Sequence, residues 1–127
     1  MVQEICPTQS RVWMKRGAWL VDVREAFELK QLSFNVDRII HMPLRELLQR
    51  FRELPADQEL VLVCWNGSKS HQAATVLIQL GFDTKLLANM RNGLERWVSK
   101  GFPVLGDPSV LGDLSGKFTC GGKGNCC

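Results

Sequence analysis

The sequence predicts an α/β fold in which a mainly parallel central sheet carries helices on both faces, giving three layers. Three observations lead to this prediction. Short apolar runs typical of buried strands alternate with segments of helical periodicity along residues 3–100. The connections between these segments are short, as expected where each helix crosses back to a parallel strand in the right-handed sense. The 127 residues are enough for one domain with its own core and too few for two.

The first half of the chain contains three expected strands and two expected helices. The strands fall at residues 3–6, 19–23 and 38–42, where short apolar runs occur. Thr8 is the expected N-cap of a helix that runs through Lys15 and ends at Gly17. This N-cap lacks a capping-box partner, because Arg11 holds the place where Glu or Gln is preferred. A shorter helix is expected at residues 24–30.

The second half repeats this alternation. Leu44, Leu47, Leu48 and Phe51 follow the i, i+3, i+4, i+7 spacing of an amphipathic helix. Residues 59–64 form a continuous apolar run typical of a central parallel strand. A strongly helical segment at residues 70–80, a short strand at 84–87 and a last helix at 94–100 complete the expected domain.

The composition changes near residue 104. The segment that follows is rich in Gly, Ser and Asp and ends in Cys-Gly-Gly-Lys-Gly-Asn-Cys-Cys. Such a segment can bury little apolar surface, so we expect it to be flexible. We therefore divide the chain into a domain of residues 1–104 and a flexible Gly/Cys-rich tail of residues 105–127.

The overall charge and apolar content exclude several classes of protein. The net charge is +3, with 16 Lys and Arg against 13 Asp and Glu, and no basic run indicates nucleic-acid binding. No apolar stretch is long enough to span a membrane. The N-terminus lacks the pattern of a secretory signal, so we expect a cytoplasmic protein. Five cysteines, an odd number, argue against a disulfide scaffold and in favour of reactive thiols or a metal site.

Cys64 is the candidate nucleophile. It ends the central strand, and the loop after it leads into the helix expected from Ser70. Ligands of parallel α/β sheets bind beyond the carboxyl ends of the strands. A loop that curls round the sulfur can direct backbone N–H groups at it, and the helix N-terminus adds a partial positive charge. Both effects favour the thiolate, which is the nucleophilic form.

The loop residues have separate expected roles. Gly67 permits a turn with positive φ, so that the loop can close tightly round the sulfur. Lys69 places a cation at the rim, where it can receive an anionic substrate. Ser70 can cap the helix or donate its hydroxyl group. Trp65 is equally compatible with packing and with forming a wall of the substrate site.

Five segments, in order and at matching spacing over about residues 2–104, make the chain resemble the rhodanese family of sulfurtransferases. They are Leu-Val-Asp-Val-Arg-Glu at residues 20–25, Ile-His-Met-Pro-Leu at 40–44, Val-Leu-Val-Cys-Trp-Asn-Gly-Ser-Lys-Ser at 61–70, Asn-Gly-Leu-Glu-Arg-Trp at 92–97 and Gly-Phe-Pro-Val at 101–104. The resemblance implies a rhodanese-like three-layer fold.

The resemblance also implies an activity. In this family the strand-tip cysteine, here Cys64, takes sulfane sulfur from thiosulfate or a related small anionic donor and passes it to cyanide or a thiol. The implied substrate-binding residues are those of the loop: Trp65, Asn66, Gly67, Ser68, Lys69 and Ser70. Its six-residue length implies sulfur transfer, because related phosphatases and arsenate reductases have one residue more. The chain differs from single-domain members at Lys69, which is often Arg, and at Trp65, where a basic residue is common.

Three tail thiols extend the hypothesis. Cys120, Cys126 and Cys127 can serve as a sulfur relay from Cys64, bind a soft metal such as zinc or copper(I) with Cys6 or another ligand, or have no role in turnover. The main hypothesis is a sulfurtransferase with a thiol or protein acceptor. The alternative is a binding module of the same fold that uses its tail for metal or partner binding. We expect no cofactor, no metal ligand among the site residues, no nucleic-acid partner and no membrane partner.

Four polar residues outside the loop are expected to be structural. Asp22 and Arg24 at a strand end should pair with each other or with the neighbouring loop. His41 and His71 should each be partly exposed or hydrogen-bonded and should not act in acid–base chemistry.

Overall fold

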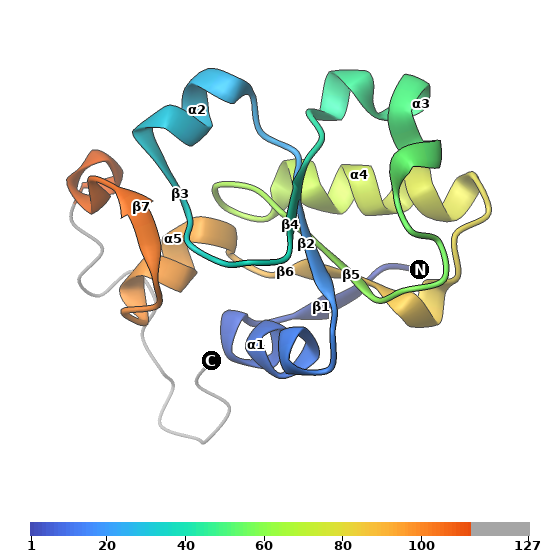
Figure 1. Ribbon diagram of the computed structural model, residues 1–127, viewed down its shortest axis with the longest axis horizontal. Helices are drawn as coiled ribbons and strands as arrows, with labels where there is room; N and C mark the ends of the chain where they lie inside the picture. Colours follow the sequence, from blue (N-terminus) through green and yellow to red (C-terminus); the bar gives the residue numbers. More distant parts are fainter. Residues whose placement is uncertain (113–127) are drawn as a thin grey trace.

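Five strands of the computed structural model, which describes residues 1–112, form a parallel sheet in the order β1-β6-β5-β2-β4 (Figure 1). Every pairing in this sheet is parallel. The strands are β1 (Gln3–Ile5), β2 (Trp19–Asp22), β4 (Ile39–His41), β5 (Leu60–Val63) and β6 (Leu87–Met90). The α/β fold class with a central parallel sheet is thereby confirmed.

Helices cover both faces of the sheet. In Figure 1, α1 (Pro7–Lys15) lies on one side of the sheet and α4 (Ser68–Gln79) on the other. Side chains alternate between these layers along each strand. In β5, Val61 and Val63 join the core beneath α5 (Gly93–Ser99), whereas Leu62 joins the core beneath α4. The sheet thus has two buried faces, which is why its central strand is apolar throughout.

The remaining elements lie around this sheet. They are the helix α2 (Ala26–Gln31), the antiparallel pair of β3 (Leu32–Phe34) and β7 (Val104–Gly106), the helix α3 (Leu47–Arg50) and the 3-10 helices η1 (Leu44–Glu46), η2 (Phe51–Glu53), η3 (Thr84–Leu86) and η4 (Pro108–Leu111). The two-stranded sheet was not expected from the sequence, because each of its strands is only three residues long.

The first helix begins earlier than predicted. Its N-cap is Cys6 and not Thr8, and Pro7 occupies the first helical position. Cys6 Sγ accepts from the N–H of Gln9 at 3.4 Å, and the Gln9 side chain accepts from the N–H of Cys6 at 3.0 Å. This arrangement is a capping box with cysteine in place of Ser or Thr. Proline favours the first helical position because its φ is already helical.

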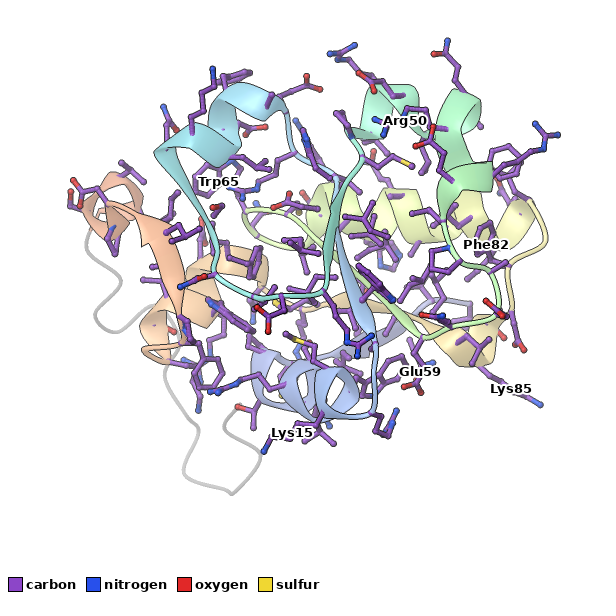
Figure 2. All side chains as sticks on the ribbon, in the orientation of Figure 1. Lys15, Arg50, Glu59, Trp65, Phe82 and Lys85 are labelled. Atoms are coloured by element: carbon purple, nitrogen blue, oxygen red, sulfur yellow. The ribbon has the colours of Figure 1, made fainter. Side chains whose placement is uncertain are left out.

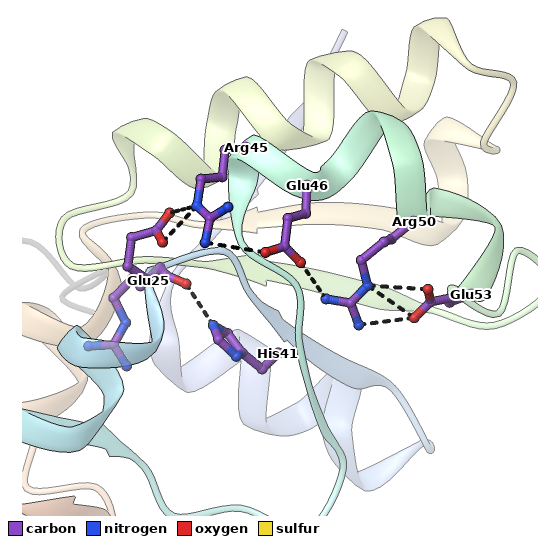
Figure 3. A network of polar contacts seen from close by, with 7 residues as sticks. Glu25, His41, Arg45, Glu46, Arg50 and Glu53 are labelled. Carbon is purple, nitrogen blue, oxygen red and sulfur yellow. Dashed lines mark hydrogen bonds and ion pairs between the residues drawn. The ribbon is translucent and has the colours of Figure 1, made fainter.

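The predicted amphipathic helix of residues 44–51 is broken into η1, α3 and η2. The prediction was wrong for Leu48, which is 68% exposed, whereas Leu47 is buried. The tighter winding of the 3-10 turns on either side changes which residues share a face. Arg50 lies on the outside of this segment and pairs with both Glu46 and Glu53 (Figure 3). Its hydrogen bond lowers the pKa of the Glu53 carboxyl below its ordinary value.

The predicted strand at residues 84–87 was also misplaced. Residues 84–86 form the 3-10 turn η3, and the Asp83 carboxylate caps it by accepting from the N–H of Lys85 at 2.9 Å. The strand starts only at Leu87 and continues to Met90. This shift brings Asn89 into the sheet, close to the end of the strand.

Folded structure continues beyond the predicted domain boundary at residue 104. Strand β7 pairs with β3, and Leu111 at the end of η4 packs against the core beneath α5. The rest of the predicted tail, residues 113–127 with Cys120, Cys126 and Cys127, lies outside the described residues. Within residues 1–112, no helix combines the length and the hydrophobicity that crossing a bilayer requires.

Candidate active site

Cys64 follows the last residue of β5 and lies at the carboxyl edge of the sheet. All strands of this sheet are parallel, so their carboxyl ends meet at the same edge, where α/β proteins bind ligands. The Cys64 side chain is 2% exposed and is not part of a disulfide. Its position at a strand tip agrees with the sequence prediction.

Three donors surround the Cys64 sulfur. The N–H of Gly67 donates to Sγ at 3.1 Å, and Ser70 donates with its N–H at 3.4 Å and with its hydroxyl at 3.3 Å. Such donors stabilise the thiolate more than the thiol, because hydrogen bonds to an ionised acceptor are the stronger ones. We call these three groups the sulfur cradle.

Helix α4 supplies two of the three cradle donors. It begins at Ser68 and not at the predicted Ser70, with Gly67 as its N-cap at φ 95°. Ser70 is therefore the third helical residue, and its N–H has no acceptor within the helix. That N–H is directed at Sγ instead. The sulfur thus lies at the positive end of a helix of 12 residues.

The shape of the loop depends on Asn66 and Gly67. The Asn66 side chain accepts from the N–H of Ser68 at 3.0 Å and from its hydroxyl at 2.9 Å, which folds the loop back on itself. A Cβ on Gly67 would lie 3.0 Å from the nitrogen of Asn92, so the backbone of residues 90–92 closes the space behind the loop. Lys69 is exposed in the first turn of α4.

Trp65 is held by two contacts on the other side of the loop. Its indole N–H donates to the Glu28 carboxylate of α2, and the Arg24 guanidinium lies 4.6 Å from the centre of its rings. Figure 2 shows Trp65 between α2 and the loop. These contacts fix the indole of the residue that follows Cys64. A role in substrate binding for the loop residues 65–70 stays a prediction.

The Asp22–Arg24 ion pair is buried next to Trp65. Two guanidinium nitrogens of Arg24 donate to the Asp22 carboxylate at 2.9 and 2.8 Å, and both side chains are at most 1% exposed. Arg24 also donates to the carbonyl of Leu32 at 2.9 Å. His41 Nε2 lies 2.7 Å from the Arg24 carbonyl, a contact that Figure 3 includes. The predicted pairing of Asp22 with Arg24 is confirmed.

Helix α5 binds the backbone of Cys64 and Trp65, a contact that the sequence analysis missed. The N–H of Leu94 donates to the carbonyl of Cys64 at 2.9 Å, and that of Glu95 donates to the carbonyl of Trp65 at 3.0 Å. Gly93 makes this approach possible, because a Cβ there would lie 2.3 Å from the Cys64 carbonyl oxygen. Gly93 lies within one of the five segments that carry the family resemblance, but its spacing from Cys64 does not indicate contact.

Behind the loop lies a polar cluster of Glu4, His71 and Asn89. His71 Nδ1 is 2.6 Å from the Glu4 carboxylate, so this histidine is hydrogen-bonded, as expected. The Asn89 side chain donates to Glu4 and to the carbonyl of Gly67. Asn89 was also missed, although a polar residue at the end of an apolar strand is a signal that could have identified it. Residues 1–112 contain no cluster of three or more His, Cys, Asp or Glu suited to a metal ion.

Comparisons with known proteins agree with this fold. Residues 7–100 match the family of rhodanese-like domains. The chain is 33% identical over 97 residues to thiosulfate sulfurtransferase GlpE of Pseudomonas syringae pv. syringae, which covers 75% of this chain and 86% of that protein. It is 31% identical over 86 residues to a sulfurtransferase of Allochromatium vinosum, with 68% and 77% covered.

A solved structure shows the same fold. The crystal structure of a rhodanese-related protein from Thermoplasma volcanium superposes with a TM-score of 0.72 at 28% identity, covering 83% of this chain and 99% of that one. Together with the family match, the strand-tip cysteine and the six-residue loop, this similarity shows that the chain belongs to the rhodanese-like family, with sulfurtransferases among its relatives.

Proposed function

We propose that this protein is a rhodanese-type sulfurtransferase that carries sulfane sulfur as a persulfide on Cys64. The observation that supports this most is the sulfur cradle, in which Gly67 and Ser70 direct three donors at a buried sulfur. A terminal persulfide is an anion, so the same donors and the same helix end that favour the thiolate also favour the loaded form.

The reaction proceeds in two half-reactions. The Cys64 thiolate attacks the outer sulfur of thiosulfate, polysulfide or another persulfide, and the S–S bond of the donor breaks. The bonding electron pair leaves with the donor remnant, which is sulfite when thiosulfate is the donor. A thiol or cyanide then attacks the outer sulfur of the Cys64 persulfide and returns Cys64 as a thiolate. Lys69, exposed in the first turn of α4, attracts the anionic donor.

Mass spectrometry tests this proposal directly. Reduced protein is incubated with thiosulfate or with polysulfide, freed of excess donor and measured intact. We expect a gain of one sulfur atom that maps to the peptide containing Cys64, and its loss with formation of thiocyanate when cyanide is added. Failure of both donors to load Cys64, or thiocyanate formation while Cys64 stays unmodified, would contradict the proposal.

The tail cysteines fit a second step, in which the chain is its own sulfur acceptor. Trp65, the residue after the nucleophile, lines a surface hollow together with Glu28 and Leu111. The described chain ends at Gly112, one residue after Leu111, so its last described residues lie at this hollow. Cys120 comes eight residues after Gly112 and is within a reach of about 26–29 Å along an extended chain.

The step itself needs no further reactant. A tail thiolate, such as that of Cys120, attacks the outer sulfur of the Cys64 persulfide. The S–S bond breaks, its electron pair returns to Cys64, and the persulfide now belongs to the tail. We propose that Cys120, Cys126 and Cys127 act in this way as a sulfur relay.

The relay is tested by a single turnover without an added acceptor. Protein loaded with one sulfur is sampled over time, alkylated and digested, and the sulfur is located by mass spectrometry. We expect it to move from the Cys64 peptide to the tail at a rate independent of protein concentration. In the matched variant with Cys120→Ser, Cys126→Ser and Cys127→Ser it should remain on Cys64. A rate proportional to protein concentration, or sulfur that never leaves Cys64, would exclude an intramolecular relay.

A further inference from the structure

Asn89 places an amide among apolar side chains on the face of β6 that packs beneath α4. It is 1% exposed, whereas its neighbour on the same face, Leu87, is part of the apolar core. The oxygen of its amide group, Oδ1, has no hydrogen-bond partner within residues 1–112. Burying an unpaired carbonyl oxygen costs free energy. The hydrogen bonds of the amide nitrogen, Nδ2, must therefore offset this cost.

Those contacts join the sheet to the active-site loop. Asn89 Nδ2 donates to both carboxylate oxygens of Glu4 at 3.0 Å and to the carbonyl of Gly67 at 3.0 Å. All three partners accept and cannot donate, so the NH2 group and not the oxygen must face them. One amide thus uses both of its N–H bonds, one toward Glu4 and one toward the loop.

Strand register explains why Glu4 orients Asn89. The two residues are direct partners in the parallel pairing of β1 with β6, so their side chains extend from the same face. The Glu4 carboxylate is held in turn by His71 of α4. His71 also donates its backbone N–H to the carbonyl of Gly67 at 3.2 Å. Residues of β6 and α4 therefore both donate to the Gly67 carbonyl, and Glu4 of β1 contacts the side chains of both donor residues.

The orientation of Gly67 determines whether its N–H faces the Cys64 sulfur. Its N–H donates to Cys64 Sγ at 3.1 Å with φ at 95°, a conformation that glycine leaves readily. Displacement of the Gly67 Cα would draw that N–H away from the sulfur. The hydrogen bonds from Asn89 and from the His71 N–H hold the Gly67 carbonyl, which belongs to the next peptide, and so anchor that Cα.

We propose that Asn89, oriented by Glu4, is a positioning residue that holds Gly67 so that its N–H stabilises the Cys64 thiolate and its persulfide. The role of Asn89 in turnover rests on the proposed sulfur transfer. Its effect on the acidity of Cys64 does not, and can be measured separately. Asn89 touches neither the substrate nor the sulfur and acts only through Gly67.

The test measures the pKa of Cys64 in variants of the full chain. Asn89→Leu removes the donor and keeps a side chain of similar size. Alkylation by iodoacetamide is followed across pH on the peptide containing Cys64, so that other thiols do not contribute. We expect the midpoint to rise by about one pH unit and the rate of sulfur loading at neutral pH to fall about tenfold.

Two further variants separate positioning from general stability. Glu4→Ala, at a partly exposed residue, should raise the midpoint in the same direction, and Glu4→Gln should raise it less because its amide oxygen can still accept from Asn89. Leu60→Ala truncates a buried residue at the amino end of β5, the opposite edge of the sheet from Cys64. This control should lower Tm without moving the midpoint.

The outcomes are distinct. A midpoint that stays in place in Asn89→Leu, or in Glu4→Ala if Asn89→Leu does not fold, would overturn the positioning role. A midpoint that rises equally in Leu60→Ala would also overturn it, because the shift would then follow stability alone. If wild-type Cys64 takes up no sulfur from either donor, the proposed function fails, yet the alkylation midpoints still decide whether Asn89 positions Gly67.

Discussion

Replacing Cys64 with serine is expected to lower kcat/KM for sulfur transfer at least about 10³-fold, a loss of about 4 kcal/mol of transition-state stabilisation. Serine keeps an oxygen that can accept from Gly67 and Ser70, so the loop should retain its shape. A hydroxyl group, however, is not ionised near neutral pH and forms no persulfide. The rate of thiocyanate formation from thiosulfate or polysulfide with cyanide provides the measurement.

The control for this variant is the chain with the three tail cysteines replaced by serine. It removes three of the five cysteines but leaves Cys64 and the sulfur cradle intact. We expect that control to form thiocyanate at close to the wild-type rate with cyanide as acceptor. Transfer by Cys64→Ser at the rate of this control would show that another group carries the sulfur.

Gly93→Ala is expected to destabilise the fold by about 3 kcal/mol or more and to disable sulfur loading. Two costs combine at this position. Alanine at φ 51° is strained, and its Cβ would lie 2.3 Å from the Cys64 carbonyl oxygen and 2.8 Å from that of Trp65. The N-terminus of α5 must move away, which breaks its hydrogen bonds to both carbonyls. Urea unfolding gives the loss of stability, and intact-mass measurement gives the loss of sulfur loading.

Gly101→Ala separates the two costs. Gly101 also has a positive φ, 77°, but among the described residues no atom other than those of its chain neighbours lies within 4 Å of the place its Cβ would occupy. This variant should lose only about 1–2 kcal/mol from backbone strain and should still load sulfur on Cys64. Equal losses of stability in the two variants would mean that the approach of α5 to the loop contributes nothing beyond strain.

The sequence was informative where the determinants are local. The apolar run of β5 and the change of periodicity after it were enough to place Cys64 at a strand tip before a helix. The start of that helix was placed two residues late, at Ser70. Serine is a favoured N-cap, whereas Gly67 caps the helix here through its left-handed backbone. Local propensity cannot distinguish these two starts, but the difference decides which N–H groups face the sulfur.

The supports of the loop could not be predicted from local patterns. Gly93 and Asn89 act on residues 64–67 through contacts between separate elements, and nothing in their own spacing indicates the partner. Leu48 is a case in which a local pattern gave a wrong prediction. Its i+4 spacing from Leu44 predicts a buried position, but the 3-10 turns around α3 leave it exposed. The tertiary arrangement decided all three cases.

The pairing of β1 with β6 has a consequence for the order in which the protein folds. Glu4 and Asn89, which meet beneath the loop, are 85 residues apart in sequence. Contacts of such long range form slowly, because most of the chain must be ordered before its ends can meet. During synthesis, Cys64 and α4 leave the ribosome before residue 89 does. We therefore expect a nascent chain to possess its nucleophile well before that nucleophile is correctly oriented, and expect the reactivity of Cys64 to appear among the last events of folding.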